Sequence, residues 1–204
     1  MQLFFATNTI SVAVAIALQE AGLEHTLTKV DFAKGEQMDA AYLGINSKGR
    51  VPALISGDHI LTETGALLEY IAALAPDKNL VPSDPIAATK MRSVTFYLAS
   101  TMHVNHAHKV RGIRWATMQS SFDDMIAKVP ETMTASATYI ENECLNGPFI
   151  GDVISIGDCY LFTVCTWLAG DGVDLDAFPK ITAFMDEMEG RASVKSVRAA
   201  GVLA

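Results

Sequence analysis

The chain has 204 residues, of which 50% are hydrophobic and 19% are charged, so it has enough apolar side chains to bury a core and is not a disordered protein. Its 15 Lys and Arg residues against 23 Asp and Glu residues leave a net charge of -8, which repels phosphate backbones and anionic lipid. We therefore expect neither a nucleic-acid partner nor a membrane partner. No apolar stretch reaches the roughly 20 residues that cross a bilayer, and the first residues have the pattern of a strand and not of a signal peptide. The sequence thus predicts a cytoplasmic protein.

The first residues alternate between strand and helix patterns. A short apolar run at 3–6 predicts a buried strand, and a loop follows at 7–9. Apolar spacing over 11–21 predicts a helix that ends at Gly22. Residues 27–30 predict a second strand, which runs parallel to the first because a crossover helix separates them. The chain therefore begins with a βαβ unit.

A hairpin and a helix follow an irregular segment. Residues 53–56 and 59–62 predict two strands, and the Gly57-Asp58 pair between them is typical of a tight hairpin turn. Residues 64–74 have the apolar spacing of a helix. The order predicts a compact, four-stranded mixed sheet.

Prolines between residues 76 and 85 interrupt the chain and predict an ordered linker over 77–86. Beyond it the alternating pattern disappears and helical spacing recurs. We therefore expect a sheet domain over 1–76 and an all-helical domain over 87–204. The helices are expected at about 86–115, 122–145, 156–168, 181–189 and 194–200.

Two features of the helical part concern folding. Pro130 lies inside a predicted helix and should kink or divide it. Ser155 and Asp158 have the spacing of a capping box, in which a hydroxyl and a carboxylate satisfy amide donors at a helix start. We therefore assign Asp158 a role in folding and not in catalysis.

The cysteines Cys144, Cys159 and Cys165 are an odd number without a close pair. Their number and spacing favour a reducing compartment over a disulfide framework or a zinc site. Cys159 and Cys165 lie among apolar residues, so we expect buried thiols that act as small hydrophobic side chains.

Pro52 stands at the head of the predicted strand at 53–56, which makes the bond between Val51 and Pro52 a candidate cis peptide. A cis bond would turn the main-chain amide and carbonyl of Val51 outward, where a peptide-like ligand could pair with them. The alternative is an ordinary trans proline that opens an edge strand.

Glu63 and Thr64 lie where the last predicted strand meets a helix. The free N–H groups of a helix start and the Thr64 hydroxyl can hold a carboxylate, and Glu63 can hold an ammonium group. Together they would recognise the zwitterionic end of an amino acid. The alternative is a helix start with a favourable cap and a nearby acid.

The densest polar cluster of the helical part comprises His103, His106, His108, Arg111, Arg114 and Trp115. On a helix His103 and His106 share one side, whereas His108 points away. This spacing disfavours a metal site, which needs three or four converging ligands, and we expect no metal. Either these histidines hydrogen-bond between helices, or His103, Arg111 and Arg114 line a cleft that meets an anionic ligand.

Five segments carry a family resemblance, at 16–23, 46–54, 61–64, 98–103 and 157–162. In this order they make the chain resemble the bacterial glutathione S-transferases, nearest to the beta class, over essentially its whole length. The resemblance implies a thioredoxin-like α/β N-terminal domain followed by an all-α C-terminal domain, usually in a homodimer. It also implies a detoxification enzyme, a transferase of alkyl or aryl groups. Such an enzyme joins the thiol of its co-substrate glutathione to an electrophilic, partly apolar small molecule.

The same resemblance implies roles for the candidate glutathione-binding residues. Val51 would pair through its main chain with the cysteinyl part of glutathione, and Pro52 would be the cis-proline. Glu63 and Thr64 would bind the γ-glutamyl end, and Lys34 would lie near the glycyl carboxylate.

The second-substrate side would lie in the helical part. His103 matches the histidine that beta-class enzymes place at the active cleft. The other candidates for this side are Met102, His106, Val110, Arg111, Arg114 and Trp115. The two arginines would favour an anionic second substrate.

The usual activating residues are missing. Beta-class members carry a cysteine where this chain has Ile10, and other classes carry a tyrosine where it has Phe5. Because glutathione reacts as its thiolate, a hydroxyl at the positive end of a helix must lower the pKa of the thiol. Ser11 is the first candidate for that donor, followed by Thr9 and Asn8.

Two alternatives remain open at this point. Thr9 could simply cap the helix, with Ser11 in its first turn. The chain could also be a glutathione-binding carrier or interaction protein with little transferase activity, because a fold does not by itself determine a function.

Overall fold

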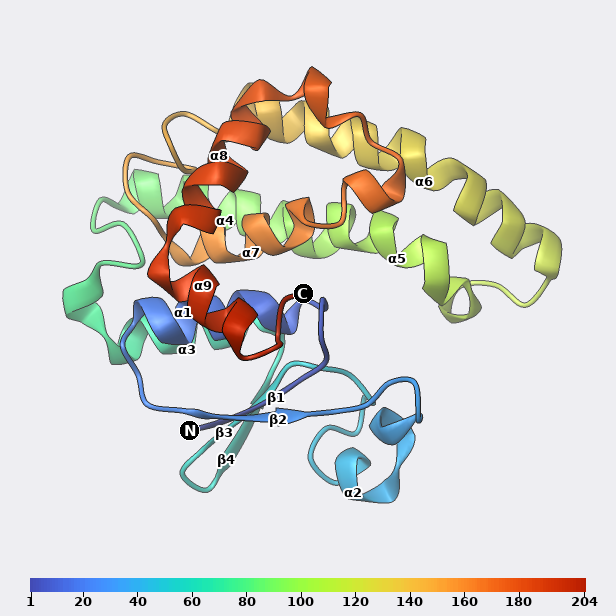
Figure 1. The fold of residues 1–204 in the computed structure, drawn as a ribbon, viewed down its shortest axis with the longest axis horizontal. Coiled ribbons are helices and arrows are strands. Elements are labelled where there is room, and N and C mark those ends of the chain that lie inside the picture. The colour runs from blue at the N-terminus through green and yellow to red at the C-terminus, as the bar shows by residue number, and fades with distance from the viewer. The chain divides into compact units, whose positions relative to one another are not determined.

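The computed structural model describes all 204 residues, and they form two compact units. The sheet unit comprises Met1–Asp84 together with Glu189–Ala204, and the helical unit comprises Pro85–Met188. The division differs from the predicted one at 87–204, because the last residues of the chain group with the sheet unit. The elements of both units are labelled in Figure 1.

The sheet unit contains the predicted βαβ unit and hairpin. Its elements are β1 (Gln2–Phe5), α1 (Ser11–Glu20), β2 (Thr26–Lys29), α2 (Ala40–Leu43), β3 (Ala53–Ser56), β4 (His59–Thr62), α3 (Thr64–Leu74) and α9 (Ala192–Ala199). The strand order is β2-β1-β3-β4. β1 pairs parallel with β2 and antiparallel with β3, which pairs antiparallel with β4. The predicted four-stranded mixed sheet is therefore confirmed.

Helix α1 is the central helix of the sheet unit. Its residues from Ser11 to Leu18 are all buried, as expected for a helix that is apolar on every side. It packs against β1, α3 and α9. Figure 1 shows the helices α1, α3 and α9 on the same side of the sheet. The end of α1 matches the prediction, because Gly22 follows with a φ of 66°.

The helical unit contains no strand and the helices predicted up to residue 189, whereas the helix predicted at 194–200 is α9 of the sheet unit. Its main helices are α4 (Pro85–Tyr97), α5 (His103–Arg111), α6 (Gln119–Tyr139), α7 (Ile156–Cys165) and α8 (Pro179–Gly190). π-helical turns at Leu98–Met102 and Ile140–Cys144 extend α4 and α6. Every residue of α7 is buried, which makes it the central helix of this unit. Its buried cysteines are all free thiols.

Two helix predictions need correction. The helix expected to reach residue 115 ends at Arg111, where Gly112 opens a 3-10 turn. Gly112 lies so close to Phe122 that a Cβ on it would come within 2.9 Å of the ring. A division of α6 at Pro130 was wrong, because the helix runs through this residue. The helix packs against α5, and we attribute its continuity to this packing, which offsets the loss of one hydrogen bond.

No helix of the chain combines the length and the hydropathy that crossing a membrane would require.

Candidate functional site

The strand register gathers the candidate glutathione-binding segments at one edge of the sheet. Phe5 pairs with Lys29. Phe4 pairs with Ala53, which pairs on its other side with Thr62. The ends of β1, β2 and β4 and the start of β3 therefore lie together, and we call this edge the site edge. The segments that adjoin it are 6–10, 30–34, 51–52 and 63–64.

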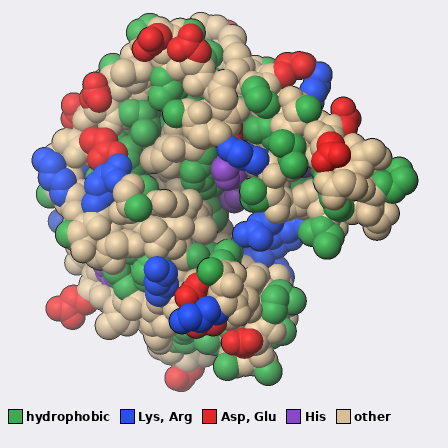
Figure 2. Space-filling view, turned by 45° about the vertical axis from the view of Figure 1, so that its right-hand side comes forward, with side chains coloured by type: hydrophobic (Ala, Val, Ile, Leu, Met, Phe, Trp, Pro, Cys, Tyr) green, Lys and Arg blue, Asp and Glu red, His purple; other side chains and the backbone are tan.

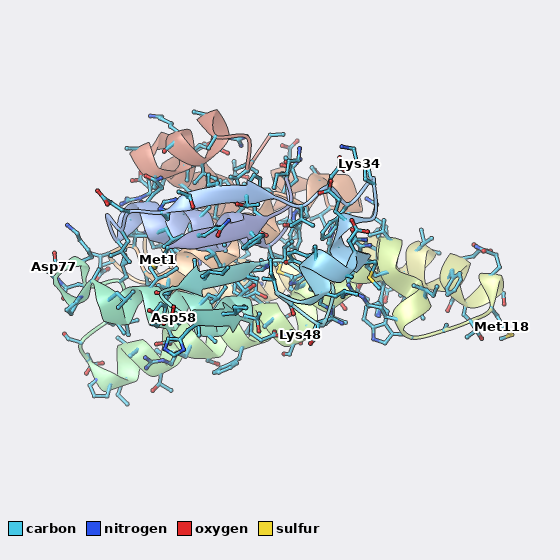
Figure 3. The ribbon with its side chains drawn as sticks, turned by 90° about the horizontal axis from the view of Figure 1, so that it is seen from below. Met1, Lys34, Lys48, Asp58, Asp77 and Met118 are labelled. Carbon is cyan, nitrogen blue, oxygen red and sulfur yellow. The ribbon has the colours of Figure 1, made fainter.

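Figure 3 shows the sheet from below, with Lys34 and Lys48 near the site edge and Asp58 at the opposite end. The bond between Val51 and Pro52 is cis, which confirms that prediction. The side chain of Val51 is buried, yet its main-chain N–H and C=O have no hydrogen-bond partner within the chain. Unpaired main-chain groups beside a sheet edge are what an extended peptide ligand requires.

Two side chains fix the peptide bond between Arg50 and Val51. The carbonyl of Arg50 accepts hydrogen bonds from the Tyr42 hydroxyl and the Asn46 side-chain amide, both at 2.7 Å. Burial raises the pKa of Tyr42 to about 12, although the hydrogen bond with Asn46 opposes this shift. Tyr42 therefore stays protonated and remains a donor, which keeps the orientation of the Val51 main chain constant.

Glu63 has an unusual backbone at the start of α3. Its φ is 75°, a conformation that costs a non-glycine residue free energy and is often retained at binding sites. Its exposed carboxylate accepts a hydrogen bond from Lys48 Nζ at 2.6 Å, and the same ammonium donates to Thr62 Oγ1 at 2.8 Å. Thr64 follows as the first, buried residue of α3.

Lys48 belongs to the site edge and was missed by sequence reasoning, which named only Lys34. The sole signal was its place inside the segment at 46–54. Lys34 itself is largely exposed and pairs with Asp31 at 3.4 Å. The structure thus brings two lysines to the site edge, each already next to a carboxylate.

The candidate activating residues have different surroundings. Thr9 is half-buried and its hydroxyl donates to the carbonyl of Ala6 at 2.8 Å. Thr9 Oγ1 and Ser11 Oγ are 3.0 Å apart, and because the single Thr9 proton is already used, Ser11 is the donor of this bond. Ser11 has no exposed surface. Asn8 is exposed, and its side-chain oxygen accepts from the N–H of Ala204.

The residues that replace the usual cysteine and tyrosine are both buried. Phe5 and Ile10 pack in the core of the sheet unit. The main-chain N–H of Ile10 has no acceptor within the chain, and it lies directly before the first residue of α1. Sequence reasoning considered only side chains here and therefore missed this main-chain donor.

Two of the candidate histidines flank one tryptophan in the helical unit. The ring centroids of His103 and His106 lie 5.1 and 4.2 Å from that of Trp167. The Nδ1 atom of His106 is 2.6 Å from the carboxylate of Asp171, which is buried and also accepts from Lys109 Nζ at 3.2 Å. The interpretation that the histidines hydrogen-bond between helical segments therefore has direct support.

Figure 2 shows His side chains next to a Lys or Arg side chain on the face in view.

The remaining candidates for the second-substrate side lie apart from the His106 contacts. Trp115 packs edge-on against His108, with ring centroids 4.6 Å apart. Arg111 ends α5, and Arg114 lies in the 3-10 turn beyond it. Met102 has no exposed surface and belongs to the core.

No three His, Cys, Asp or Glu side chains are grouped so that they could hold a metal ion.

A four-stranded mixed sheet with a cis-proline at its edge, joined to a set of helices, defines a thioredoxin-like domain with a helical C-terminal part. Family models agree with this class. The glutathione S-transferase N-terminal domain matches residues 1–73, and the glutathione S-transferase C-terminal domain matches residues 116–192.

Similar proteins extend the match to nearly the whole chain. The glutathione S-transferase GstA of Escherichia coli O157:H7 is 30% identical over 98% of both chains. A glutathione transferase homologue from Sulfitobacter, solved with bound glutathione, is 59% identical with a TM-score of 0.97, covering 99% of this chain and 98% of its own. The beta-class enzyme of Sphingomonas chungbukensis is 29% identical with a TM-score of 0.85, over 98% of both chains. The chain belongs to the glutathione S-transferase family of enzymes.

Proposed function

We propose that this protein conjugates the thiol of glutathione to an electrophilic, partly apolar small molecule, as a cytoplasmic detoxification enzyme. The observation that carries the proposal is the pair of unpaired main-chain groups on Val51 next to the cis-proline, at the same sheet edge as the unpaired N–H of Ile10 before α1. A peptide ligand that pairs with Val51 would bring its thiol toward that helix start.

The remaining glutathione contacts follow from the charges at the site edge. Thr64 and the free N–H groups at the start of α3 would hold the γ-glutamyl carboxylate, and Glu63 would take its ammonium group. Lys34 and Lys48 are the cations available for the glycyl carboxylate. Lys48 forms an ion pair with Glu63. To bind the glycyl carboxylate, its ammonium group would have to leave Glu63 for the ligand.

Thr9 is our candidate for the direct donor to the thiolate, because it is half-buried whereas Ser11 is completely enclosed. If the Thr9 hydroxyl turns from the Ala6 carbonyl to the thiolate, Ser11 still donates to Thr9 and orients it. The N–H of Ile10 and the positive end of α1 would add to this stabilisation. The thiolate then attacks the electrophilic carbon, the new carbon–sulfur bond forms, and the leaving group departs with its electron pair. No covalent bond to the enzyme forms.

The helical unit would supply contacts for the second substrate. His103, His106, Arg111, Arg114 and Trp115 carry the cationic and aromatic groups for this task. Val110 and Ile113 are strongly exposed nearby in the chain. This mixture suits a substrate with an apolar body and an anionic group.

The test is a panel of electrophiles assayed with glutathione. We expect conjugation by the natural chain, and a loss of at least about tenfold in kcat for Thr9→Val, which removes the hydroxyl with little change of shape. Thr9→Ser is the matched control and should retain activity. Ser11→Ala should have a smaller effect than Thr9→Val. Equal activity of Thr9→Val and the natural chain would remove Thr9 from the mechanism and leave the Ile10 amide as the donor.

The second candidate function is a glutathione-binding carrier with little transferase activity. It is favoured by the hydroxyl protons of Thr9 and Ser11, which both already have acceptors inside the protein. A spectroscopic titration of bound glutathione separates the two functions. A thiol pKa near that of free glutathione would support the carrier, and a clearly lowered pKa would support the transferase.

We also propose a homodimer. Phe96 and Ile86 on α4 are 72% and 66% exposed, and a second copy of the chain that packed on α4 would remove this apolar surface from water. Light scattering should give twice the mass of one chain, and Phe96→Asp should reduce it to one. Val153→Asp, at an exposed loop position, is the control that should leave the dimer intact. A monomeric natural chain would contradict the proposal.

A further inference from the structure

The C-terminal segment Glu189–Ala204 holds both ends of α1, and we call this segment the clasp. At the far end of α1, the carboxylate of Glu20 accepts two hydrogen bonds from Arg191, at 2.7 and 2.8 Å, and one from Ser193 at 2.5 Å. Burial raises the pKa of Glu20, but these hydrogen bonds together lower it more, so that the net pKa lies below its usual range. The clasp is thus tied to the C-terminal end of α1 by an ion pair.

At the other end of α1, the clasp meets the loop that precedes the helix. The N–H of Asn8 donates to the carbonyl of Val202 at 3.0 Å, and the N–H of Ala204 donates to the side-chain oxygen of Asn8 at 2.8 Å. The Thr7 hydroxyl donates to the carbonyl of Gly201 at 3.0 Å. Figure 1 shows the C-terminal end of the chain beside the segment that joins β1 to α1.

The path of the clasp is itself well determined. Gly201 has a φ of 72°, and the N–H of Val202 reaches the carbonyl of Val197 at 3.1 Å, which is the turn that commonly ends a helix at glycine. This turn sends the chain back toward Asn8. Val202 is completely buried, and Arg198 holds the carbonyl of Ala204 at 2.7 Å.

We propose that the clasp positions the thiol-activating loop, with Asn8 as a positioning residue and not a donor to the thiol. This inference rests on the proposed function. Asn8 has a φ of 59°, which few residues tolerate without supporting contacts. Its two hydrogen bonds with the clasp, one donated and one accepted, supply those contacts. The next residues are Thr9 and Ile10, which carry the candidate donors. A change of the backbone at Asn8 therefore moves both donors together.

The experiment compares three variants of the full chain. Asn8→Gly accepts the same φ but loses the side-chain acceptor, a second variant lacks residues 202–204, and a third combines the two changes. Lys195→Ala is the control, because its ammonium contacts only the carbonyl of Gly190 on the exposed side of α9. The readouts are the pKa of the bound glutathione thiol, the pH profile of kcat/KM, and the KM for glutathione.

We expect Asn8→Gly and the truncation each to raise the pKa of the bound thiol by about 0.5–1 unit, which lowers kcat near neutral pH by roughly three- to tenfold. The KM for glutathione should change by less than about twofold, because the groups of Val51 and Thr64 are untouched. The combined variant should be no worse than the truncation, since the truncation already removes the Ala204 N–H that Asn8→Gly leaves without its acceptor. Lys195→Ala should match the natural chain.

Natural pH profiles in Asn8→Gly and in the truncated chain would overturn the proposal. So would additive effects in the combined variant. If the truncated chain fails to fold, Asn8→Gly carries the test alone, because it leaves Val202 and Leu203 in the core.

A failure of the proposed function is distinguishable from a failure of the clasp. If the natural chain leaves the thiol pKa unchanged, the transferase proposal fails while the clasp can still be tested by amide hydrogen exchange. The amides of Thr9 and Val12, which donate to the carbonyls of Ala6 and Thr9, should then lose protection in Asn8→Gly. Unchanged protection would show that the clasp does not position this loop.

Discussion

The central helices of the two units, α1 and α7, are both largely buried but begin in different ways. At the start of α7, the carboxylate of Asp158 accepts hydrogen bonds from the N–H of Ser155, the Ser155 hydroxyl and the N–H of Ile150, at 2.6 to 2.8 Å. At the start of α1 no side chain of the cap residue Ile10 forms such a bond, and its N–H is unpaired. One helix has a carboxylate at its positive end, whereas at the other the N–H groups of Ser11 and Val12 donate to Thr9 and the N–H of Ile10 has no acceptor within the chain.

The carboxylates that secure the two helices also differ in their pKa shifts. Burial raises the pKa of Asp158 from 3.8 to about 6, although four hydrogen bonds oppose the shift. For Glu20 at the far end of α1, burial also raises the pKa, but the bonds from Arg191 and Ser193 prevail and the net shift is downward. A cation partner therefore decides the sign. The comparison predicts opposite responses of the two units to pH.

The largest expected effect is that of Asp158→Ala. It leaves three buried donors without an acceptor, each worth about 1 kcal/mol, so the free energy of unfolding should fall by about 3 kcal/mol at pH 5. Urea unfolding measures the loss. Ser155→Ala is the matched control, with an expected loss of about 1 kcal/mol. If Asp158→Ala loses no more than Ser155→Ala, then α7 is not secured by this carboxylate.

The second prediction concerns the pH dependence that Asp158 causes. Because its folded pKa is raised, the folded state binds more protons than the unfolded state between about pH 4 and pH 6, and stability falls as pH rises through this window. The shift of about two units sets an upper limit of about 3 kcal/mol for this loss. Urea unfolding of Asp158→Ala over the same window should lack it. If the difference in free energy of unfolding between the natural chain and Asp158→Ala instead rises with pH, the pKa of Asp158 is not raised in the folded state.

The third prediction concerns the ion pair of α1. Arg191→Gln leaves the half-buried charge of Glu20 with only the Ser193 hydroxyl, so we expect a loss of about 1–2 kcal/mol in the free energy of unfolding at pH 7. Because the folded pKa of Glu20 lies below its ordinary value of 4.5, the stabilising contribution of this ion pair is present above pH 4.5 and disappears as pH falls through the folded pKa. The difference between Arg191→Gln and the natural chain should therefore shrink in acid. A constant difference would show that Arg191 acts through packing alone.

The smallest effect is expected at a surface ion pair of the same unit as α7. Lys128 and Glu131 lie 2.6 Å apart on α6, but both side chains are more than half exposed. Lys128→Ala should change the free energy of unfolding by less than about 0.5 kcal/mol. A loss comparable to that of Arg191→Gln would contradict the view that burial, and not distance, makes the Glu20 pair important.

Much of the local structure could be predicted from the sequence. The strands, the hairpin at Gly57 and the capping box at Ser155 depend on residues within a few positions of one another, so their patterns are visible in the chain. The predictions that were wrong depend on packing between distant segments. At the end of α5, Gly112 lies so close to Phe122 that a Cβ would not fit, and α6, which packs against α5, continues through Pro130.

The candidate site was predictable only in part. Val51 and Pro52 were found because a proline at the head of a strand is a local signal. The pairing of His106 with Asp171, 65 residues further along, has no such signal. The same is true of Lys48 with Glu63, and in both cases a hydrogen-bond partner is defined only when the chain has folded.

The sequence by itself determined the order of elements and the change from strand patterns in the first part of the chain to helical spacing in the second. Only the tertiary structure decided that the C-terminal residues join the sheet unit and meet Asn8, and that Ser11 is enclosed while Thr9 is half-buried. The physical reason is range. Periodicity and turn chemistry act over a few residues, whereas burial and hydrogen-bond partners depend on which distant segments the fold brings together.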